Sequence, residues 1–294
     1  MLFRFGTVFQ NIGEVTNKGF EISLTTINIS TDAVTWTTSF NFSKNNNEVT
    51  ALYEDTNEIY KDANDGYSAD DLIRVGYPLN SYYNWVMDGV WQADETDLAT
   101  AYGQSEGQGR VVDFDNNGII NEDDKRMLGS KLPDWTGGFT TTITFRNFDL
   151  SASLITRQGV FVYSPFHAEY TNHEDRGRAK LNIDWYMQEN PVTPTRHVNF
   201  YPQPKNAGIY WRNSQVGYYR DASFTKIKNI TLGYTFPSAL VSQIGIRSLR
   251  VYANILNPFV FTDYDGFDPE WADASLSNGG LSSITYQFGV NLKF

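Results

Sequence analysis

The chain has 294 residues, of which 40% are hydrophobic and 15% aromatic, with a formal net charge of −11 and no cysteine. The negative charge argues against nucleic acid as a partner, and the lack of cysteine excludes disulfides and thiol chemistry. No run of eighteen apolar residues is present, which excludes a transmembrane helix but not transmembrane strands, whose alternation keeps the mean hydropathy low (−0.42).

The start of the chain has neither the basic segment nor the apolar segment of a signal peptide. A secreted or outer-membrane protein requires such a peptide. We therefore expect either a cytosolic protein or a fragment of a longer precursor.

Seven segments alternate apolar and polar residues with the period of two that is typical of strands with one apolar face. In chain order they are residues 19–27, 34–44, 139–146, 148–157, 222–236, 249–255 and 284–294. Their polar positions are mainly Ser, Thr and Asn, which suit a hydrated lumen. The last segment, ITYQFGVNLKF, ends on Phe294 and resembles the C-terminal insertion signal of bacterial outer-membrane barrels.

The connections between these segments alternate between short and long. The short ones are residues 28–33, the turn around Asn147 and residues 237–248, and the long ones are residues 45–136, 158–221 and 262–283. In an antiparallel meander, all short turns then lie at one end and all long loops at the other. This predicts an all-β fold, an antiparallel transmembrane β-barrel segment with long extracellular loops. The alternative is a secreted, calcium-stabilised β-sandwich that binds glycan.

The long connection 45–136 is the most acidic part of the chain. From Glu48 to Asp134 it holds nineteen acidic residues against six basic ones. Residues 81–92, SYYNWVMDGVWQ, have the composition of a further strand, but counting them as a spanning strand would break the alternation of loops. We therefore expect them to lie outside the barrel wall.

Residues 113–124, DFDNNGIINEDD, have the spacing of a calcium-binding loop with Gly118 at its sharp turn. The predicted ligands are Asp113, Asp115, Asn117, the carbonyl of Ile119, Asn121 and Asp124. Their oxygens at this spacing would surround one Ca²⁺ with a structural role, holding the shape of the loop. The alternative is an acidic loop of Asx turns without metal.

A second acidic cluster, TDYDGFDPEW at residues 262–271, lacks the calcium spacing, so we expect a solvated turn. Lys226 and Lys228 stand at apolar positions of their segment. Either they meet lipid head-group phosphates or a local bulge turns them inward. The pattern does not choose between the two.

No enzyme motif is present. His167, His173 and His197 have no metal-binding or nucleophile spacing, and we expect them to be structural or surface residues. The chain also lacks the Gly-rich nucleotide loops and the G-x-S-x-G pattern. We therefore expect no catalytic residue.

Several stretches, taken together, resemble the C-terminal portion of the SusC/RagA family of TonB-linked outer-membrane transporters. In chain order they are NIGEVTNKGFEISL, DFDNNGIINEDDKRMLGSKLPDWTGGF, FRNFDLSASL, YYRDASFTKIKNITLGYTFP, IRSLRVYANILNPFVFTDYDGFDPEW and FGVNLKF. Each is weak alone, but the ordered set covers nearly the whole chain, 1–294.

The resemblance implies a barrel of about 22 strands with an N-terminal plug, of which this chain would supply about the last seven. It also implies the bacterial outer membrane, with its lipid, as location, energy from the TonB complex through the absent N-terminal part, and a SusD-like surface lipoprotein as partner. The cargo would be an oligosaccharide or a peptide.

Overall fold

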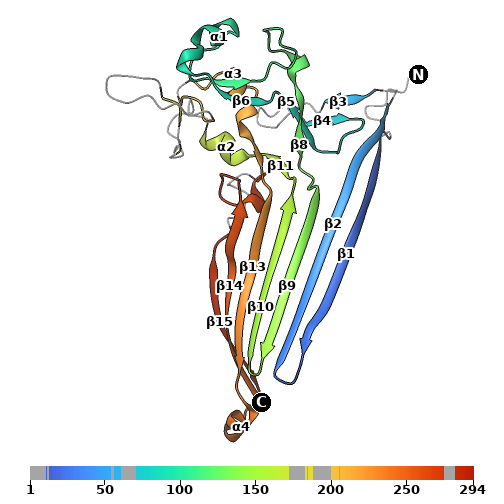
Figure 1. Cartoon of the computed structure of the whole chain (residues 1–294), viewed down its shortest axis with the longest axis vertical. Coiled ribbons are helices and arrows are strands. Elements are labelled where there is room, and N and C mark those ends of the chain that lie inside the picture. Colours follow the sequence, from blue (N-terminus) through green and yellow to red (C-terminus); the bar gives the residue numbers. More distant parts are fainter. Residues whose placement is uncertain are drawn as a thin grey trace, which may run out of the picture. The chain divides into compact units, whose positions relative to one another are not determined.

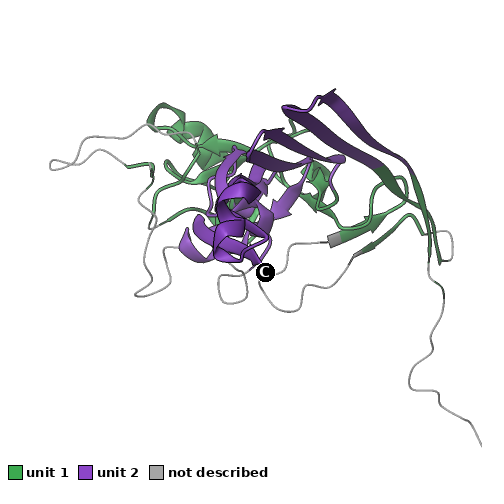
Figure 2. Ribbon diagram, turned by 90° about the horizontal axis from the view of Figure 1, so that it is seen from below, with its two compact units in different colours: residues 1–18, 45–132, 183–217 green, residues 19–44, 133–182, 218–294 purple. Residues whose placement is uncertain are grey.

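The computed structural model describes residues 11, 13–53, 56–60, 71–171, 183, 185–187, 200–204, 206–274 and 282–294. His173 and His197 lie outside the described residues. The chain forms two compact units (Figure 2), which we describe separately. The first comprises residues 1–18, 45–132 and 183–217, and the second comprises residues 19–44, 133–182 and 218–294.

One sheet holds seven long strands in the order in which they follow along the chain (Figure 1). They are β1 (Gly13–Ser30), β2 (Val34–Leu52), β9 (Trp135–Phe145), β10 (Phe148–Gln158), β13 (Phe224–Thr235), β14 (Ser248–Thr262) and β15 (Thr285–Lys293). From β2 onward every neighbouring pair is antiparallel. The seven predicted strands and their meander order are therefore confirmed. A single sheet of this kind differs from the two packed sheets of the alternative sandwich.

The connection 45–136, expected to be a loop, has strands of its own. β2 continues into it as far as Leu52. Two small sheets follow, formed by β3 (Glu58–Tyr60), β4 (Asp71–Arg74), β5 (Ser81–Asn84) and β8 (Arg126–Ser130), and by β6 (Met87–Val90) with β7 (Gly109–Val111). Residues 81–92 thus pair outside the seven-stranded sheet, as expected.

The remaining elements are short. β11 (Phe161–Tyr163) pairs with β12 (Tyr219–Asp221), and the helices are α1 (Thr96–Ala101), α2 (Pro165–Tyr170), α3 (Ile209–Arg212) and α4 (Ser238–Val241). Single 3-10 turns lie at Ala93–Glu95, Glu122–Asp124, Val216–Tyr218, Ser242–Ile244 and Pro269–Trp271. None of the helices in the described part of the chain has both the length and the apolar character needed to cross a membrane.

The register of the six strands from β2 to β15 in this sheet sorts side chains into apolar and polar rows. An apolar row runs through Trp36, Ile143, Leu150, Leu232, Ala253 and Phe288. The residue adjacent to each of these along its strand belongs to a polar row. This row consists of Thr37, Thr142, Ser151, Thr231, Asn254 and Gln287. Within the polar row Thr231 donates to Asn254 at 3.0 Å, and Asn254 donates to Gln287 at 3.0 Å.

The apolar face is exposed. Leu232 is 52% exposed and Phe288 is 83% exposed. Exposed single apolar residues are common on proteins, but a continuous face of them marks a surface that meets an apolar environment.

Two glycines on the polar face make room for large neighbours. The Tyr252 ring lies over Gly289, where a Cβ would come within 2.3 Å of the ring. Arg250 reaches Asp149 across Gly233, with its Nε 2.9 Å from Asp149 Oδ1. Strand positions without a side chain therefore accommodate both contacts.

Gly289→Val is expected to destabilise the sheet by about 1–3 kcal/mol, because the added side chain would displace the Tyr252 ring. The measurement is the free energy of unfolding in detergent micelles. Asn291→Val, which alters the same face of the same strand, is the control. Equal free energies for the two variants would show that Tyr252 does not need the space above Gly289.

Candidate functional site

The loop 113–124 brings three carboxylates together. One oxygen from each of Asp113, Asp115 and Asp124 lies within 4.8 Å of the other two. Carboxylates this close together repel one another at neutral pH unless a cation or hydrogen-bond donors compensate their negative charges. The identity of these compensating groups determines what the site can hold.

The backbone of the loop folds as the spacing predicts. Gly118 takes a φ of +81° and Asn116 a φ of +57°, the left-handed conformation that glycine and asparagine tolerate best. Local Asx bonds hold the turn: the Asn117 amide donates to Asp115 Oδ1 at 3.0 Å, and the Ile119 amide donates to Asn117 Oδ1 at 2.7 Å.

Asp124 is the buried centre of the loop. Its side chain is fully buried, and its two oxygens accept the backbone N–H groups of Phe114 (2.8 Å) and Asn121 (2.9 Å). Two backbone hydrogen bonds, one to each oxygen, fix the orientation of this carboxylate. This fixes the distance between the two ends of the loop.

Asp113 has one satisfied and one unsatisfied oxygen. Oδ2 accepts from the Tyr102 hydroxyl and the Gly118 amide, both at 2.8 Å, whereas Oδ1 is buried and has no hydrogen-bond partner among the described residues. Burial raises the pKa of Asp113, but the bonds from Tyr102 and Gly118 outweigh it and hold the pKa below its ordinary value. A buried carboxylate oxygen without a donor fits a cation, because a cation would satisfy it.

Three of the six predicted ligands form this group. Asn117 lies next to it, since its Nδ2 donates to Asp115 Oδ2 at 2.8 Å. Asn121 is engaged elsewhere: its Oδ1 accepts from the Asp123 amide (2.7 Å) and its carbonyl accepts from Trp85 Nε1 (2.7 Å). Ile119 is 64% exposed.

A bulge in β13 decides the position of the two lysines. The register with β10 shifts between Ser153 and Leu154, so that Lys226 pairs with Ile155 and Asn229 pairs with Ser153. The extra residue, Lys228, reverses the alternation and turns Lys226 to the polar face. Of the two alternatives left open by the sequence, the bulge is correct.

Lys226 is fully buried within an ion-pair cluster. Its Nζ lies 2.8 Å from Asp268 Oδ2, 2.9 Å from Glu270 Oε2 and 2.9 Å from Ser282 Oγ. Lys228, which is more exposed, adds a contact of 3.2 Å to Glu270. A buried ammonium requires such partners, since an unpaired one would be strongly disfavoured.

The solvated turn expected for residues 262–271 is therefore wrong for two of its four acids, Asp268 and Glu270, whereas Asp265 is exposed. Asp268 and Glu270 hold Lys226, and Asp265 Oδ1 lies 3.0 Å from Arg220 Nε. Burial raises the pKa of both Asp268 and Glu270. The hydrogen bonds from Lys226, Ser282 and the Glu270 backbone outweigh it at Asp268, and those from Lys226 and Lys228 outweigh it at Glu270, so each pKa lies below its ordinary value. The sequence pattern missed this because the lysines are more than forty residues away along the chain.

The Lys226→Met substitution leaves two acids close together without their cation, and is expected to destabilise the fold by about 3–5 kcal/mol at neutral pH. Because their pKa values are depressed in the fold, the cluster stabilises fully above the ordinary values of 3.8 (Asp268) and 4.5 (Glu270). This contribution is lost as the pH falls through the lower folded-state values.

The measurement is unfolding free energy against pH, with Lys228→Met as the control, which loses only a half-exposed contact worth less than about 1 kcal/mol. The deficit of Lys226→Met should shrink in acid. A deficit that is equal for both lysines, or independent of pH, would contradict the cluster.

A second buried network was not foreseen from the sequence. His167 is fully buried, with Nδ1 2.8 Å from Ser164 Oγ and Nε2 2.8 Å from Asp265 Oδ1, although the latter contact is poorly aligned for a hydrogen bond. Ser164 in turn meets the Tyr264 hydroxyl at 2.8 Å. Burial lowers the pKa of His167 despite the nearby Asp265. The network joins α2 to the segment after β14, which agrees with a structural role for His167.

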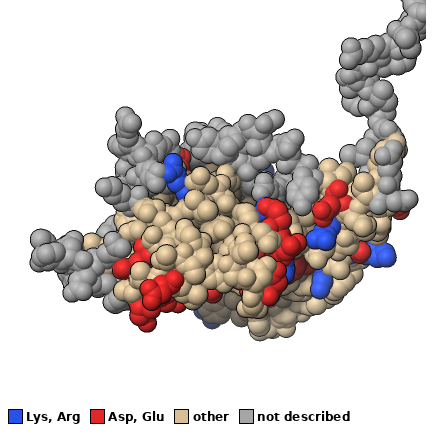
Figure 3. All heavy atoms as spheres, turned by 90° about the horizontal axis from the view of Figure 1, so that it is seen from above, with Lys and Arg blue, Asp and Glu red and all other residues tan. Residues whose placement is uncertain are grey.

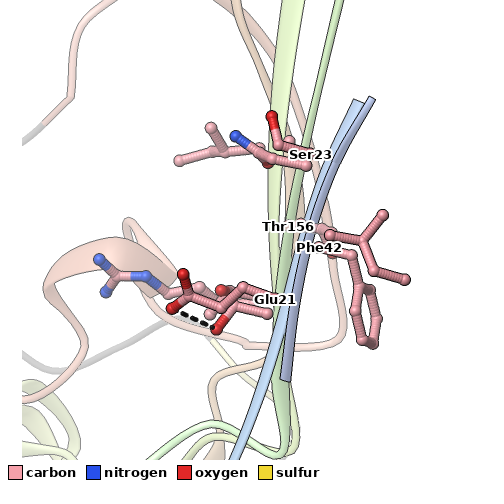
Figure 4. Close-up of a pocket in the computed structure, with 12 residues that line it drawn as sticks. Glu21, Ser23, Phe42 and Thr156 are labelled. Carbon is pink, nitrogen blue, oxygen red and sulfur yellow. Dashed lines mark hydrogen bonds between the residues drawn. The ribbon is translucent and has the colours of Figure 1, made fainter. Parts of the chain in front are cut away.

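The polar face also carries a groove of about 550 Å³ over β1, β2, β9 and β10. It lies between two rows of side chains. One row contains Glu21, Ser43, Thr136 and Arg157, and the other Ser23, Asn41, Gly138 and Ile155. Glu21 and Ser23 point to one side of the strands and Phe42 to the other (Figure 4).

Two features of this groove favour a polar ligand. Within the described part of the chain the Arg157 guanidinium is exposed and has no ion-pair partner, and Glu21 has one long hydrogen bond, 3.4 Å from Ser43 Oγ. The missing side chain of Gly138 leaves room for the Asn41 side-chain amide, whose Oδ1 a Cβ at Gly138 would approach to 2.4 Å. Elsewhere, acidic side chains gather in separate groups on the face that Figure 3 shows.

The chain is similar in sequence to several known proteins. No family model matches the chain. TonB-dependent receptor P3 of Formosa agariphila is 30% identical over 97% of the chain, and TonB-dependent receptor SusC of Bacteroides thetaiotaomicron is 29% identical over 97%. The chain spans only 29% and 27% of the lengths of these relatives.

Solved structures agree on the fold. A structure of the RagAB peptide transporter matches 99% of the chain with a TM-score of 0.74 at 24% identity, and the match covers 30% of that transporter chain. The RagAB peptide importer in its closed-closed state matches with a TM-score of 0.72.

Proposed function

We propose that this chain, which belongs to the SusC/RagA-type TonB-dependent receptors, forms part of the barrel wall of a nutrient importer. TonB-dependent receptors reside in the bacterial outer membrane, and so does this chain. The observation that carries the proposal is the single seven-stranded sheet with one exposed apolar face and one polar face. A lipid-facing and a lumen-facing surface require this division.

The two open edges support the same proposal. Among the described residues β1 and β15 end the sheet, and each edge presents backbone groups that require further strands in a bilayer. A closed barrel of about 22 strands would supply them. The remaining strands and the plug would come from the rest of a longer protein.

The proposed cargo is an oligosaccharide or a peptide. The RagAB relatives are described as peptide transporters, and a SusC relative is among the receptors of similar sequence. We extend to this chain a SusD-like lipoprotein as partner and TonB as the source of energy. No catalytic step is part of the proposal, since the relatives are named as receptors and transporters.

We further propose that the loop 113–124 binds one structural Ca²⁺. Asp113, Asp115 and Asp124 would hold the ion directly, with the unsatisfied Asp113 Oδ1 as a ligand. Asn117 and the Ile119 carbonyl complete the set, and Asn121 acts through water. The ion would offset the repulsion among the carboxylates and stiffen the loop.

Asp113→Ala combined with Asp124→Ala is expected to abolish calcium binding and to raise protease cleavage between Gly103 and Pro133. Barrel insertion should stay intact, because this loop is not part of the seven-stranded sheet. Limited proteolysis of intact cells with calcium or chelator, together with calorimetry, measures both effects. If cleavage does not change with calcium and calorimetry detects no calcium binding, the proposed metal site is wrong and the loop is an acidic turn without metal.

Leu232→Arg is expected to destabilise the receptor in bilayers by about 2–4 kcal/mol, because Leu232 stands on the lipid-facing row. Thr231→Arg, one residue away on the polar face, should be milder. The measurement is the free energy of folding into lipid vesicles. Equal effects of the two substitutions would contradict the proposed orientation of the two faces of the sheet.

The function itself is tested by uptake. Cells that express the full receptor should accumulate a radiolabelled peptide or oligosaccharide library, and deletion of TonB should abolish this accumulation. Uptake that is unchanged without TonB, or absent for every member of both libraries, would overturn the proposed importer.

A further inference from the structure

We propose that the polar-face groove over β1, β2, β9 and β10 binds a short peptide by its two charged termini. The proposal rests on the importer function above and deepens it, because it selects a peptide over a neutral oligosaccharide at this surface. Two opposite charges that have no ion-pair partner among the described residues, their spacing and the polar groups between them support it.

The two charges stand at opposite ends of one row. Glu21 lies on β1 and Arg157 on β10, with Ser43 on β2 and Thr136 on β9 between them. Three strand spacings of about 4.8 Å separate the outer strands by about 14 Å. An extended peptide advances about 3.3–3.6 Å per residue, so about four residues span the row.

Each charge is available for a ligand. Glu21 has only the 3.4 Å bond to Ser43, and Arg157 has no ion pair within the described residues. A carboxylate suits the two-pronged guanidinium, and an ammonium suits Glu21. Both terminal charges of a peptide would thus be paired, whereas a neutral saccharide would leave Glu21 and Arg157 without charged partners.

The floor between the charges suits a peptide backbone. Gly138 carries no side chain, and the Asn41 amide beside it offers both a donor and an acceptor. Ser23 and Ser43 add hydroxyls on either side of the groove. The N–H and C=O groups of a peptide backbone need this mixture of donors and acceptors.

The test is calorimetry on the full receptor in detergent with tetra-alanine, which has no charged side chain. We expect blocking either terminus, by N-acetylation or C-amidation, to weaken binding about tenfold, and Glu21→Gln or Arg157→Gln to do the same. The effects should be non-additive in matched pairs. Acetylation should have no further effect in Glu21→Gln, and amidation none in Arg157→Gln.

Two control substitutions remove the same charges elsewhere. Glu14→Gln stands at an apolar-face position of β1, and Arg247→Gln precedes β14. Both should bind tetra-alanine as the unsubstituted receptor does. Blocked and free peptides that bind equally, effects that add in full, or no binding at all would overturn the proposal.

A failure of the groove proposal can be distinguished from a failure of the importer function. If TonB-dependent uptake persists while tetra-alanine binding ignores Glu21 and Arg157, the groove proposal fails and the importer stands. If TonB-dependent uptake is absent for all cargo, the importer function fails, whatever the calorimetry shows.

Discussion

The structure depends on one constraint, which is that the apolar face of the seven-stranded sheet is exposed and not covered by any other part of the chain that the structure describes. Phe288, Tyr286 and Leu232 are more than half exposed on that face. Burying a large side chain of this kind gains about 1.5–3 kcal/mol, so a row of them in water would be strongly disfavoured. A lipid environment for this face resolves the problem, while Thr231, Asn254 and Gln287 on the opposite face hydrogen-bond to one another as a hydrated surface allows.

The bulge at Lys228 shows how the sheet changes at the end where the long connections begin. On the C-terminal side of the bulge, Ile230 and Leu232 lie on the apolar face. On its N-terminal side the alternation is reversed, and Lys226 lies on the polar face. The turn at Pro269–Trp271 is then fixed by Asp268 and Glu270 on Lys226. A single inserted residue thereby links the wall to the segment that follows β14.

The sequence predicts the strands well because the period of two is a local property, visible in 284–294 or 148–157 without any partner. It also identifies Asp113, Asp115 and Asp124, because the turn at Gly118 sets their spacing. It fails where contacts are distant. Lys226 and Asp268 meet across forty-two residues, and Ser164 meets Tyr264 across a hundred. Asn121 is equally unpredictable, since its side chain and carbonyl are taken by Asp123 and Trp85.

The most direct test of the two-faced sheet is the accessibility of single spin labels along β13, measured with oxygen as the lipid-soluble probe and a nickel chelate as the aqueous one. In the receptor reconstituted in vesicles, labels at Ile230, Leu232 and Tyr234 should meet oxygen, and those at Asn229, Thr231 and Thr235 the chelate. Beyond Lys228 the phase should reverse, so that Thr225 and Ile227 meet oxygen. Accessibility without alternation, or a phase that continues unchanged through Lys228, would contradict a wall with one face in lipid and one in water.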